Sequence, residues 1–254
     1  MVEWEKNYKV EIKVSITINY IKTNDLSILS EFDNLVKFLS EQEVEIYQSY
    51  KVEFKKVEFL LGRVLLKKII GELLNVEPSS IVFKKSKYGK LFLDNSMFKD
   101  KPIYFNLSHS NGLLVCVIGL DEVGVDVERI CPVDFKIMKH IFRMEEIDYV
   151  LEAKTLFEKE SRFFYIWTRK EAFLKAIGMG FYKDPLSFQV PIKEDKTKNE
   201  YNYYTFNLYS EYKVSVVVRN NNSTPIQFIF QEINICKDGN LDFSIMECQH
   251  KSIF

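Results

Sequence analysis

The chain is organised around the stretch Val123-Gly124-Val125-Asp126-Val127-Glu128, a short run of β-branched residues that carries two acids. Such a run predicts a strand, in which successive side chains point to opposite faces. Asp126 and Glu128 then share one face, while Val125 and Val127 share the other. Two neighbouring carboxylates repel each other unless a cation lies between them, and oxygen ligands suit magnesium or manganese. The same pair on a solvated strand would serve solubility alone, so the pattern leaves both interpretations open.

The composition of the chain indicates a globular protein of one or two domains. Its 254 residues are 46% hydrophobic and 15% aromatic, which is enough to form a core without disulfides. The 35 Lys and Arg residues nearly balance the 36 Asp and Glu residues, which argues against a nucleic-acid partner. The four cysteines and three histidines show no metal-ligand spacing. Since the sequence has neither a signal-peptide pattern nor an apolar run long enough to cross a bilayer, we expect a cytoplasmic protein without a membrane partner.

The residues before this strand predict an α+β unit. Apolar and polar residues alternate over residues 9–20, which is typical of a strand, and Ser40 and Glu43 fit a capping box at the start of a helix. Apolar residues at helical spacing over residues 52–74 predict a long amphipathic helix. Tyr88-Gly89-Lys90 is typical of a turn. Further strands are expected at residues 81–83, 103–107 and 113–120.

The residues from 123 onward repeat the same order of elements. After the strand at 123–128, the pattern predicts a long helix over residues 161–177, which ends at Gly178. Shorter helices are expected at 134–142 and 145–151, strands at 187–190, 203–209, 212–219 and 225–232, and a solvated loop at 193–202. The repetition predicts a duplicated α+β fold, with an N-terminal half over residues 1–120 and a C-terminal half carrying the metal site over residues 121–254.

The long helix at 161–177 places Glu171 beside Lys175, because residues four apart are neighbours on a helix surface. An exposed pair of this kind contributes only about 0.2–0.5 kcal/mol. The surrounding aromatic and aliphatic residues indicate a mostly buried helix, in which an acid and a lysine need partners. A metal ion and a phosphate would supply both partners.

The stretch Asn106-Leu107-Ser108-His109-Ser110 places small hydroxyls and a histidine at the end of a predicted strand. A lone histidine is more often a packing or turn residue than a functional one. Strand ends followed by tight turns expose backbone N–H groups, however, and these suit a phosphate together with Ser108 and His109. Lys90 would add a cation, although a lysine in a turn is usually only solvated.

Three stretches in this order and spacing resemble the Sfp-type 4'-phosphopantetheinyl transferase family. They are Asn106-Leu107-Ser108-His109-Ser110, Gly124-Val125-Asp126-Val127-Glu128 and Trp167-Thr168-Arg169-Lys170-Glu171-Ala172-Phe173-Leu174-Lys175-Ala176. Tyr88-Gly89-Lys90 also lies where that family has its Y-G-K turn, and the resemblance spans about residues 40–190. It implies a fold of two similar α+β subdomains related by a pseudo-twofold axis, with the site in the cleft between them.

The resemblance implies transfer of the phosphopantetheine arm of coenzyme A to a serine of an acyl or peptidyl carrier protein, with release of adenosine 3',5'-bisphosphate. Asp126, Glu128 and Glu171 match the acids that hold magnesium, or manganese, against the pyrophosphate of coenzyme A. Glu171 would also be the base for the serine proton. Lys175 would neutralise charge or donate a proton on the leaving side, so that Asp126, Glu171 and Lys175 form the catalytic set.

Ser108, His109 and Lys90 match contacts to the phosphates of coenzyme A in that family. The resemblance also implies that the carrier protein docks around residues 129–142, just after the acids. Because a duplicated chain closes its own twofold cleft, we expect a monomer.

Two positions depart from the family pattern. Glu58 stands where the family often has an arginine that reaches a coenzyme A phosphate, and an acid there would repel that phosphate. Lys55, Lys56 or Arg63 could take the place of the arginine. Leu91 follows the Y-G-K turn where proline is usual, which affects the rigidity of the turn rather than its chemistry.

Two alternative functions would use the same residues. A magnesium-dependent phosphodiesterase would employ the three acids on a small nucleotide, and it would hydrolyse coenzyme A without a carrier. An inactive family member would only bind coenzyme A or a carrier protein, and Glu58 is the feature that favours this alternative.

Overall fold

The computed structural model describes residues 14–23, 32–94, 103–119, 121–192, 200–219, 226–236, 241–242 and 249–251. The start of the first expected strand, residues 9–13, and most of the expected loop at 193–202 lie outside these ranges. The helices are α1 (Asp33–Val36), α2 (Glu41–Ser49), α3 (Glu53–Leu74), α4 (Met138–Ile141), α5 (Met144–Leu151) and α6 (Leu156–Ala176). The strands are β1 (Val14–Lys22), β2 (Phe83–Lys85), β3 (Leu91–Leu93), β4 (Tyr104–Ser110), β5 (Leu113–Gly119), β6 (Val123–Arg129), β7 (Tyr201–Leu208), β8 (Tyr212–Arg219), β9 (Ile226–Glu232), β10 (Asn234–Ile235), β11 (Leu241–Asp242) and β12 (Gln249–Lys251). None of the helices in these ranges combines the length and the apolar character needed to cross a membrane.

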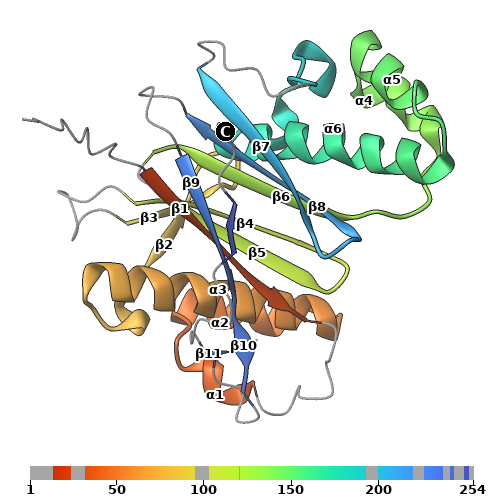
Figure 1. Cartoon of the computed structure of the whole chain (residues 1–254). Coiled ribbons are helices and arrows are strands. Elements are labelled where there is room, and N and C mark those ends of the chain that lie inside the picture. Colours follow the sequence, from red (N-terminus) through yellow and green to blue (C-terminus); the bar gives the residue numbers. More distant parts are fainter. Residues whose placement is uncertain are drawn as a thin grey trace, which may run out of the picture.

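Two β-sheets pack around a shared apolar core, and helices cover their outer faces (Figure 1). The larger sheet has the strand order β12-β9-β1-β5-β4, and the smaller has the order β6-β8-β7. Alternate residues of both sheets fill the core, for example Ile18 of β1, Val125 of β6 and Phe228 of β9. α3 packs against the larger sheet and α6 against the smaller. This arrangement confirms the predicted duplicated α+β fold.

Three of the helices begin or end close to the predicted positions. α2 follows the predicted capping box, since Ser40 Oγ accepts from the N–H of Glu43 and the Glu43 carboxylate accepts from the N–H of Ser40. α3 has nearly the predicted bounds. α6 begins at Leu156, earlier than predicted, because Thr155 Oγ1 caps the helix by accepting from the N–H of Glu158 at 3.1 Å.

The predicted end of β4 is wrong. The strand does not stop at residue 107 but pairs with β5 as far as Ser110. Asn111 and Gly112 alone form the turn, with φ of 41° and 85° in the left-handed region. The backbone of Ser108 and His109 is therefore part of the sheet and does not form a phosphate cradle after it.

The strand expected at residues 187–190 is also absent. Pro185–Ser187 forms a short 3-10 turn instead. The N–H of Val190, which a strand would have paired with a backbone carbonyl, donates to the buried Glu146 carboxylate at 2.9 Å. The alternating pattern of residues 187–190 predicted that this N–H would pair with another strand, but it pairs with a side chain distant in the sequence.

The strand β9 returns to the first half of the molecule. It follows β7 and β8 in the sequence, yet it pairs in parallel with β1 in the larger sheet, from Val14 opposite Ile226 to Tyr20 opposite Glu232. The larger sheet therefore contains a strand from beyond residue 121, and the division of the chain at residues 120 and 121 stays a prediction.

Candidate active site

The acids of β6 lie on the face of the strand that α6 covers. The valines of this strand point into the core between the sheets and are fully buried: Val123, Val125 and Val127. Because side chains alternate, Gly124, Asp126 and Glu128 face the other way, as the sequence predicts. Asp126 is only 3% exposed, although it carries a carboxyl group.

Gly124 allows α6 to lie directly on β6. A Cβ atom at this position would stand 2.1 Å from the carbonyl oxygen of Ala172 and 2.4 Å from the nitrogen of Ala176, so only glycine fits. Closer to the N-terminus of the same helix, Thr168 Oγ1 lies 2.7 Å from Ser215 Oγ of β8. This close packing brings Glu171 and Lys175 of α6 down to the acids of β6.

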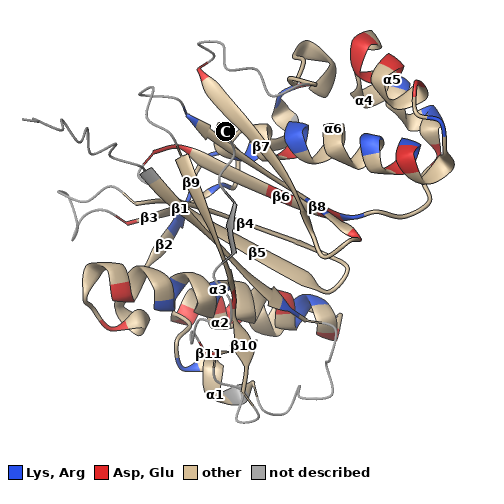
Figure 2. Cartoon of the chain, viewed as in Figure 1, with Lys and Arg blue, Asp and Glu red and all other residues tan. Residues whose placement is uncertain are grey.

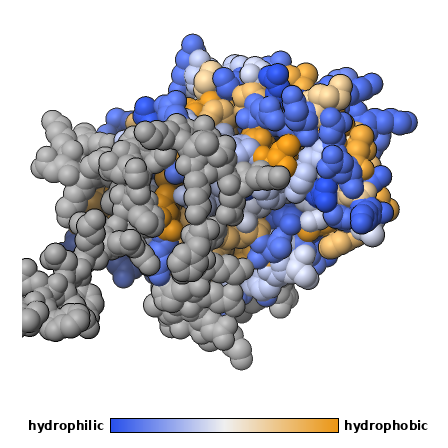
Figure 3. All heavy atoms as spheres, turned by 45° about the horizontal axis from the view of Figure 1, so that its top comes forward, coloured by the Kyte–Doolittle hydropathy of each residue, from blue (hydrophilic) through white to orange (hydrophobic). Residues whose placement is uncertain are grey.

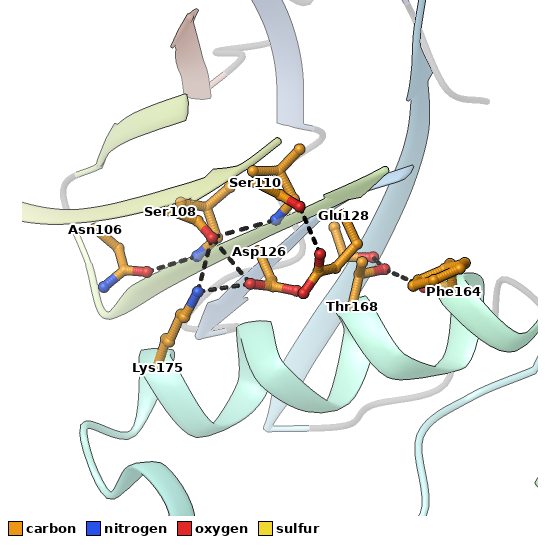
Figure 4. Close-up of polar contacts among 11 residues, drawn as sticks. Asn106, Ser108, Ser110, Asp126, Glu128, Phe164, Thr168 and Lys175 are labelled. Carbon is orange, nitrogen blue, oxygen red and sulfur yellow. Dashed lines mark hydrogen bonds and ion pairs between the residues drawn. The ribbon is translucent and has the colours of Figure 1, made fainter. Parts of the chain in front are cut away.

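The side chains of β4 join this strand to β6 where the two sheets meet, as Figure 4 shows. Asn106 Oδ1 accepts from the N–H of Val125 at 2.9 Å. Ser108 Oγ donates to Asp126 Oδ1 at 2.9 Å, and Ser110 Oγ donates to Glu128 Oε2 at 2.6 Å. These contacts hold the two acids in place. We call the contacts of Asn106, Ser108 and Ser110 with β6 the seam.

Lys175 completes the cluster from the helix side. Its Nζ donates to Asp126 Oδ1 at 2.6 Å and to Ser108 Oγ at 2.8 Å (Figure 4). The structure thus brings together five of the predicted site residues: Ser108, Asp126, Glu128, Glu171 and Lys175.

The carboxyl groups of this cluster have raised pKa values. The pKa of Glu171 is raised to about 7, chiefly by burial and also by the charges of Asp126 and Glu128, while Lys175 opposes the change. Burial likewise raises the pKa of Asp126 and of Glu128, opposed by Lys175 and by the hydrogen bond of Ser110, respectively. Each of these carboxylates would be stabilised by an added cation.

The donor set fits a hard divalent cation. Asp126 Oδ2 and Glu171 Oε1 are buried and have no hydrogen-bond partner in the structure as described. Unpaired buried carboxylate oxygens are costly, and oxygen ligands are those that magnesium prefers. Within the described ranges, however, no three Asp, Glu, His or Cys side chains stand close enough to form a ready-made metal-binding group. Lys175 instead pairs with one oxygen of Asp126.

A cavity of about 280 Å³ opens beside Lys175. Its lining includes the Tyr88-Gly89-Lys90 turn, Leu107 of β4 and Gly178 after α6. Lys90 Nζ donates to the carbonyl oxygen of Ala176 at 2.6 Å and to that of Val123 at 3.3 Å, and burial lowers its pKa to about 8. The turn predicted to bind phosphate therefore also ties α6 to β6.

His109 lies on the other face of β4 from Ser108. It faces α3 rather than β6, and its Nδ1 is 3.3 Å from Glu58 Oε2. Burial lowers the pKa of His109, and the Glu58 carboxylate opposes this change. Because neighbouring residues of a strand point to opposite faces, His109 does not join Ser108 at the acids, and its expected contact with a coenzyme A phosphate stays a prediction.

Asn106, Ser110 and Gly124 were not predicted as site residues. A signal for the first two was present, since polar residues at positions 106, 108 and 110 alternate with Leu107 and His109. That pattern predicts one polar face of a strand. It does not predict that this face contacts β6, because the contact depends on how the two sheets pack together.

Comparison with known proteins identifies the family. A family model described as "4'-phosphopantetheinyl transferase superfamily" matches residues 122–228, and one described as "4'-phosphopantetheinyl transferase, N-terminal" matches residues 27–120. The 4'-phosphopantetheinyl transferase gsp of Aneurinibacillus migulanus is 34% identical over 191 residues, which cover 72% of this chain and 78% of the relative. Sfp of Bacillus subtilis is 29% identical over 166 residues (65% and 71%), and HetI of Nostoc is 32% identical over 157 residues (61% and 65%). This chain therefore belongs to the family of Sfp-type 4'-phosphopantetheinyl transferases.

Proposed function

We propose that this transferase moves the phosphopantetheine arm of coenzyme A to a serine of an acyl or peptidyl carrier protein with the help of magnesium held by Asp126, Glu128 and Glu171. The observation that carries the proposal is the buried carboxylate cluster, with raised pKa values and two unpartnered oxygens beside Lys175. Magnesium at this site would supply neutralisation of charge on the pyrophosphate of the donor.

Glu171 is suited to accept the serine proton. Its pKa of about 7 lies near neutral pH, where a general base is most effective. Because Glu171 is also a proposed metal ligand, it acts either directly or through a bound water. Lys175 lines the cavity and pairs with Asp126. When the substrate binds, the ammonium group of Lys175 would leave Asp126 and contact the leaving phosphate, whose negative charge it would neutralise.

The cavity beside Lys175 is the proposed place for the nucleotide end of the donor. Lys90 and Asn106 contribute polar groups to a lining that is otherwise largely apolar. Ser108 lies at the boundary between this cavity and the acids, since its hydroxyl contacts both Lys175 and Asp126. Lys90 and Ser108 keep their predicted roles as contacts to coenzyme A in this proposal.

The carrier protein is proposed to dock on the surface formed by α4, α5 and the start of α6. Large apolar side chains are exposed there, namely Ile137 at 45%, Met144 at 69%, Leu156 at 63% and Phe157 at 64%. Figure 3 turns this side of the molecule forward and shows apolar patches between hydrophilic residues. Ile137 belongs to the predicted docking segment at residues 129–142, and the other three residues extend the surface beyond it.

A carrier modification assay tests the proposed function. Purified protein, coenzyme A and magnesium are expected to add the arm to an apo carrier protein, which mass spectrometry detects as a mass increase. A chelator should stop the transfer, and added magnesium should restore it. Failure with several acyl and peptidyl carriers would contradict the proposal, and hydrolysis of coenzyme A without a carrier would favour a phosphodiesterase instead.

A further inference from the structure

Three hydroxyl groups form a network where α6 rests on the smaller sheet. Thr168 Oγ1 of α6 lies 2.7 Å from Ser215 Oγ of β8, and Ser215 Oγ lies 2.9 Å from Thr205 Oγ1 of β7. Thr168 and Ser215 are fully buried. We call these three side chains the hydroxyl network. Because buried hydroxyls need partners, the positions of the helix and the two strands depend on one another.

Both ends of the hydroxyl network meet a group with a single possible role. Arg169 Nε can only donate, and it donates to Thr205 Oγ1 at 2.8 Å. The carbonyl oxygen of Phe164 can only accept, and it takes the proton of Thr168 Oγ1 at 2.8 Å (Figure 4). Since each hydroxyl has one proton, Thr205 must donate to Ser215, and Ser215 must donate to Thr168. Every hydroxyl of the network is then both donor and acceptor, so the removal of one costs its neighbours a hydrogen bond.

The hydroxyl network constrains the rotation of α6 about its own axis. The close approach at Gly124 brings the helix down to β6, but a steric contact alone permits the helix to turn. Thr168 and Arg169 are adjacent residues, which point about 100° apart on a helix. Thr168 bonds to β8, while Arg169 bonds to β7 and to the carbonyl oxygen of Pro191 at 2.6 Å. Directional hydrogen bonds on two sides of the helix favour the one rotation in which all of them form.

The rotation of α6 decides where Glu171 points. Glu171 follows Thr168 by three residues, so the two side chains are neighbours on the helix surface. Ser215 lies directly opposite Asp126 in the pairing of β8 with β6, and opposite residues share a face of the sheet. The hydroxyl network therefore fastens α6 at a strand position beside Asp126, about one turn from Glu171.

We propose that the hydroxyl network holds Glu171 opposite Asp126, which makes Thr205 and Ser215 positioning residues for the transfer reaction. This inference rests on the proposed function, in which the two acids act together. Thr205 and Ser215 act through the position of the helix, because their hydrogen bonds run to each other and to two residues of α6.

Two variants of Thr205 test the role of its hydroxyl in steady-state transfer to an apo carrier. Thr205→Val keeps the shape and the strand propensity but removes the hydroxyl, and we expect kcat to fall about tenfold with KM for coenzyme A within about twofold of wild type. Thr205→Ser retains the hydroxyl and should keep kcat close to wild type. Ser215→Ala breaks the network at its centre and should lower kcat as Thr205→Val does. Thr17→Val, at a half-buried threonine of β1 in the larger sheet, is the matched control.

Tryptophan fluorescence detects the same movement of α6 without any reaction. Trp167 belongs to α6, and its side chain forms a hydrogen bond with the carboxylate of Glu128. In a Trp4→Phe background Trp167 is the only tryptophan of the chain, so its emission reports the rotation of the helix. We expect the emission maximum to shift in Thr205→Val, but not in Thr205→Ser or Thr17→Val.

The results separate the inference from the proposed function. Wild-type kcat and emission in both Thr205→Val and Ser215→Ala would overturn the inference and leave the proposed function intact. Equal losses of kcat in Thr205→Val and Thr205→Ser would also overturn it, since the effect would then come from packing rather than from the hydroxyl. Absence of transfer by the wild-type protein would contradict the proposed function, and the emission spectra would still decide whether the hydroxyl network positions α6.

Discussion

The carboxyl of Glu171 has a pKa of about 7, above the ordinary value of 4.5, mainly because of burial. The folded protein thus holds this proton more tightly than the unfolded chain does. Its contribution to stability is complete below the unfolded pKa of 4.5 and is lost as the pH rises through about 7. Above that pH the fold carries the cost of burying an ionised carboxylate in the cluster.

Replacing Glu171 should therefore separate stability from activity. In metal-free protein, Glu171→Gln is expected to raise the free energy of unfolding at pH 8 by about 2 kcal/mol, and to change it little at pH 4. The same variant should lose carrier modification. Urea unfolding at the two pH values, with chelator present, measures the first effect. Glu152→Gln, an exposed acid, serves as the control; a Glu171→Gln variant less stable than wild type at pH 8 would contradict the prediction.

Lys175 and Asp126 should show strong coupling. Lys175→Met leaves the buried Asp126 carboxylate without its cation, and we expect it to destabilise the metal-free fold by about 2 kcal/mol. Asp126→Asn removes the same pair from the other side. In a double-mutant cycle, the double variant should lose less stability than the sum of the two single losses. Simple additivity would show that the pair contributes nothing to the fold.

The contact of α6 with β6 depends on Gly124. Gly124→Ala places a methyl group within 2.1 Å of the Ala172 carbonyl oxygen, so the helix must move away from the strand. We expect a loss of about 3 kcal/mol in the free energy of unfolding and a fall in kcat, because Glu171 and Lys175 move with the helix.

Gly119→Ala provides a matched control for this change. At Gly119 in β5 the nearest heavy atom to an added Cβ is 3.6 Å away, which is an ordinary contact. Thermal melting of the two variants should differ clearly, with Gly119→Ala close to wild type. Equal melting temperatures would mean that α6 does not rest on β6 as described.

Local patterns predicted most of the elements, and non-local hydrogen bonds explain the exceptions. The long helices and the strand β6 follow from periodicity and caps that lie within the segments themselves. Residues 187–190 alternate like a strand, but the partner of Val190 is the carboxylate of Glu146. The shared face of Asp126 and Glu128 was predictable in the same way, whereas the opposite facing of Ser108 and His109 needed the true length of β4.

The two halves predicted from the repeated order of elements are not separate in the folded molecule. Many of the charged residues lie on the helices outside the two sheets (Figure 2), and the two sheets share one core. The repetition of element order predicted two similar halves. It did not predict that β9 joins β1, because strand order in a sheet depends on contacts between distant parts of the chain.

The crossing of β9 leads to a test with fragments. Residues 1–120 alone leave the edge of β1 unpaired, so this fragment should not unfold cooperatively. Residues 226–236, attached to it through a flexible linker, should restore a cooperative transition by circular dichroism. Cooperative unfolding of the shorter fragment alone would show that the first half is an independent domain.

The seam between β4 and β6 has a consequence for how substitutions can change this protein. In an ordinary sheet, neighbouring strands are joined by backbone groups that no substitution can remove, apart from proline. Here Asn106, Ser108 and Ser110 make the joint with their side chains. Part of the contact between the two sheets therefore depends on three side chains, each of which a single substitution can remove without breaking the backbone hydrogen bonds of either sheet.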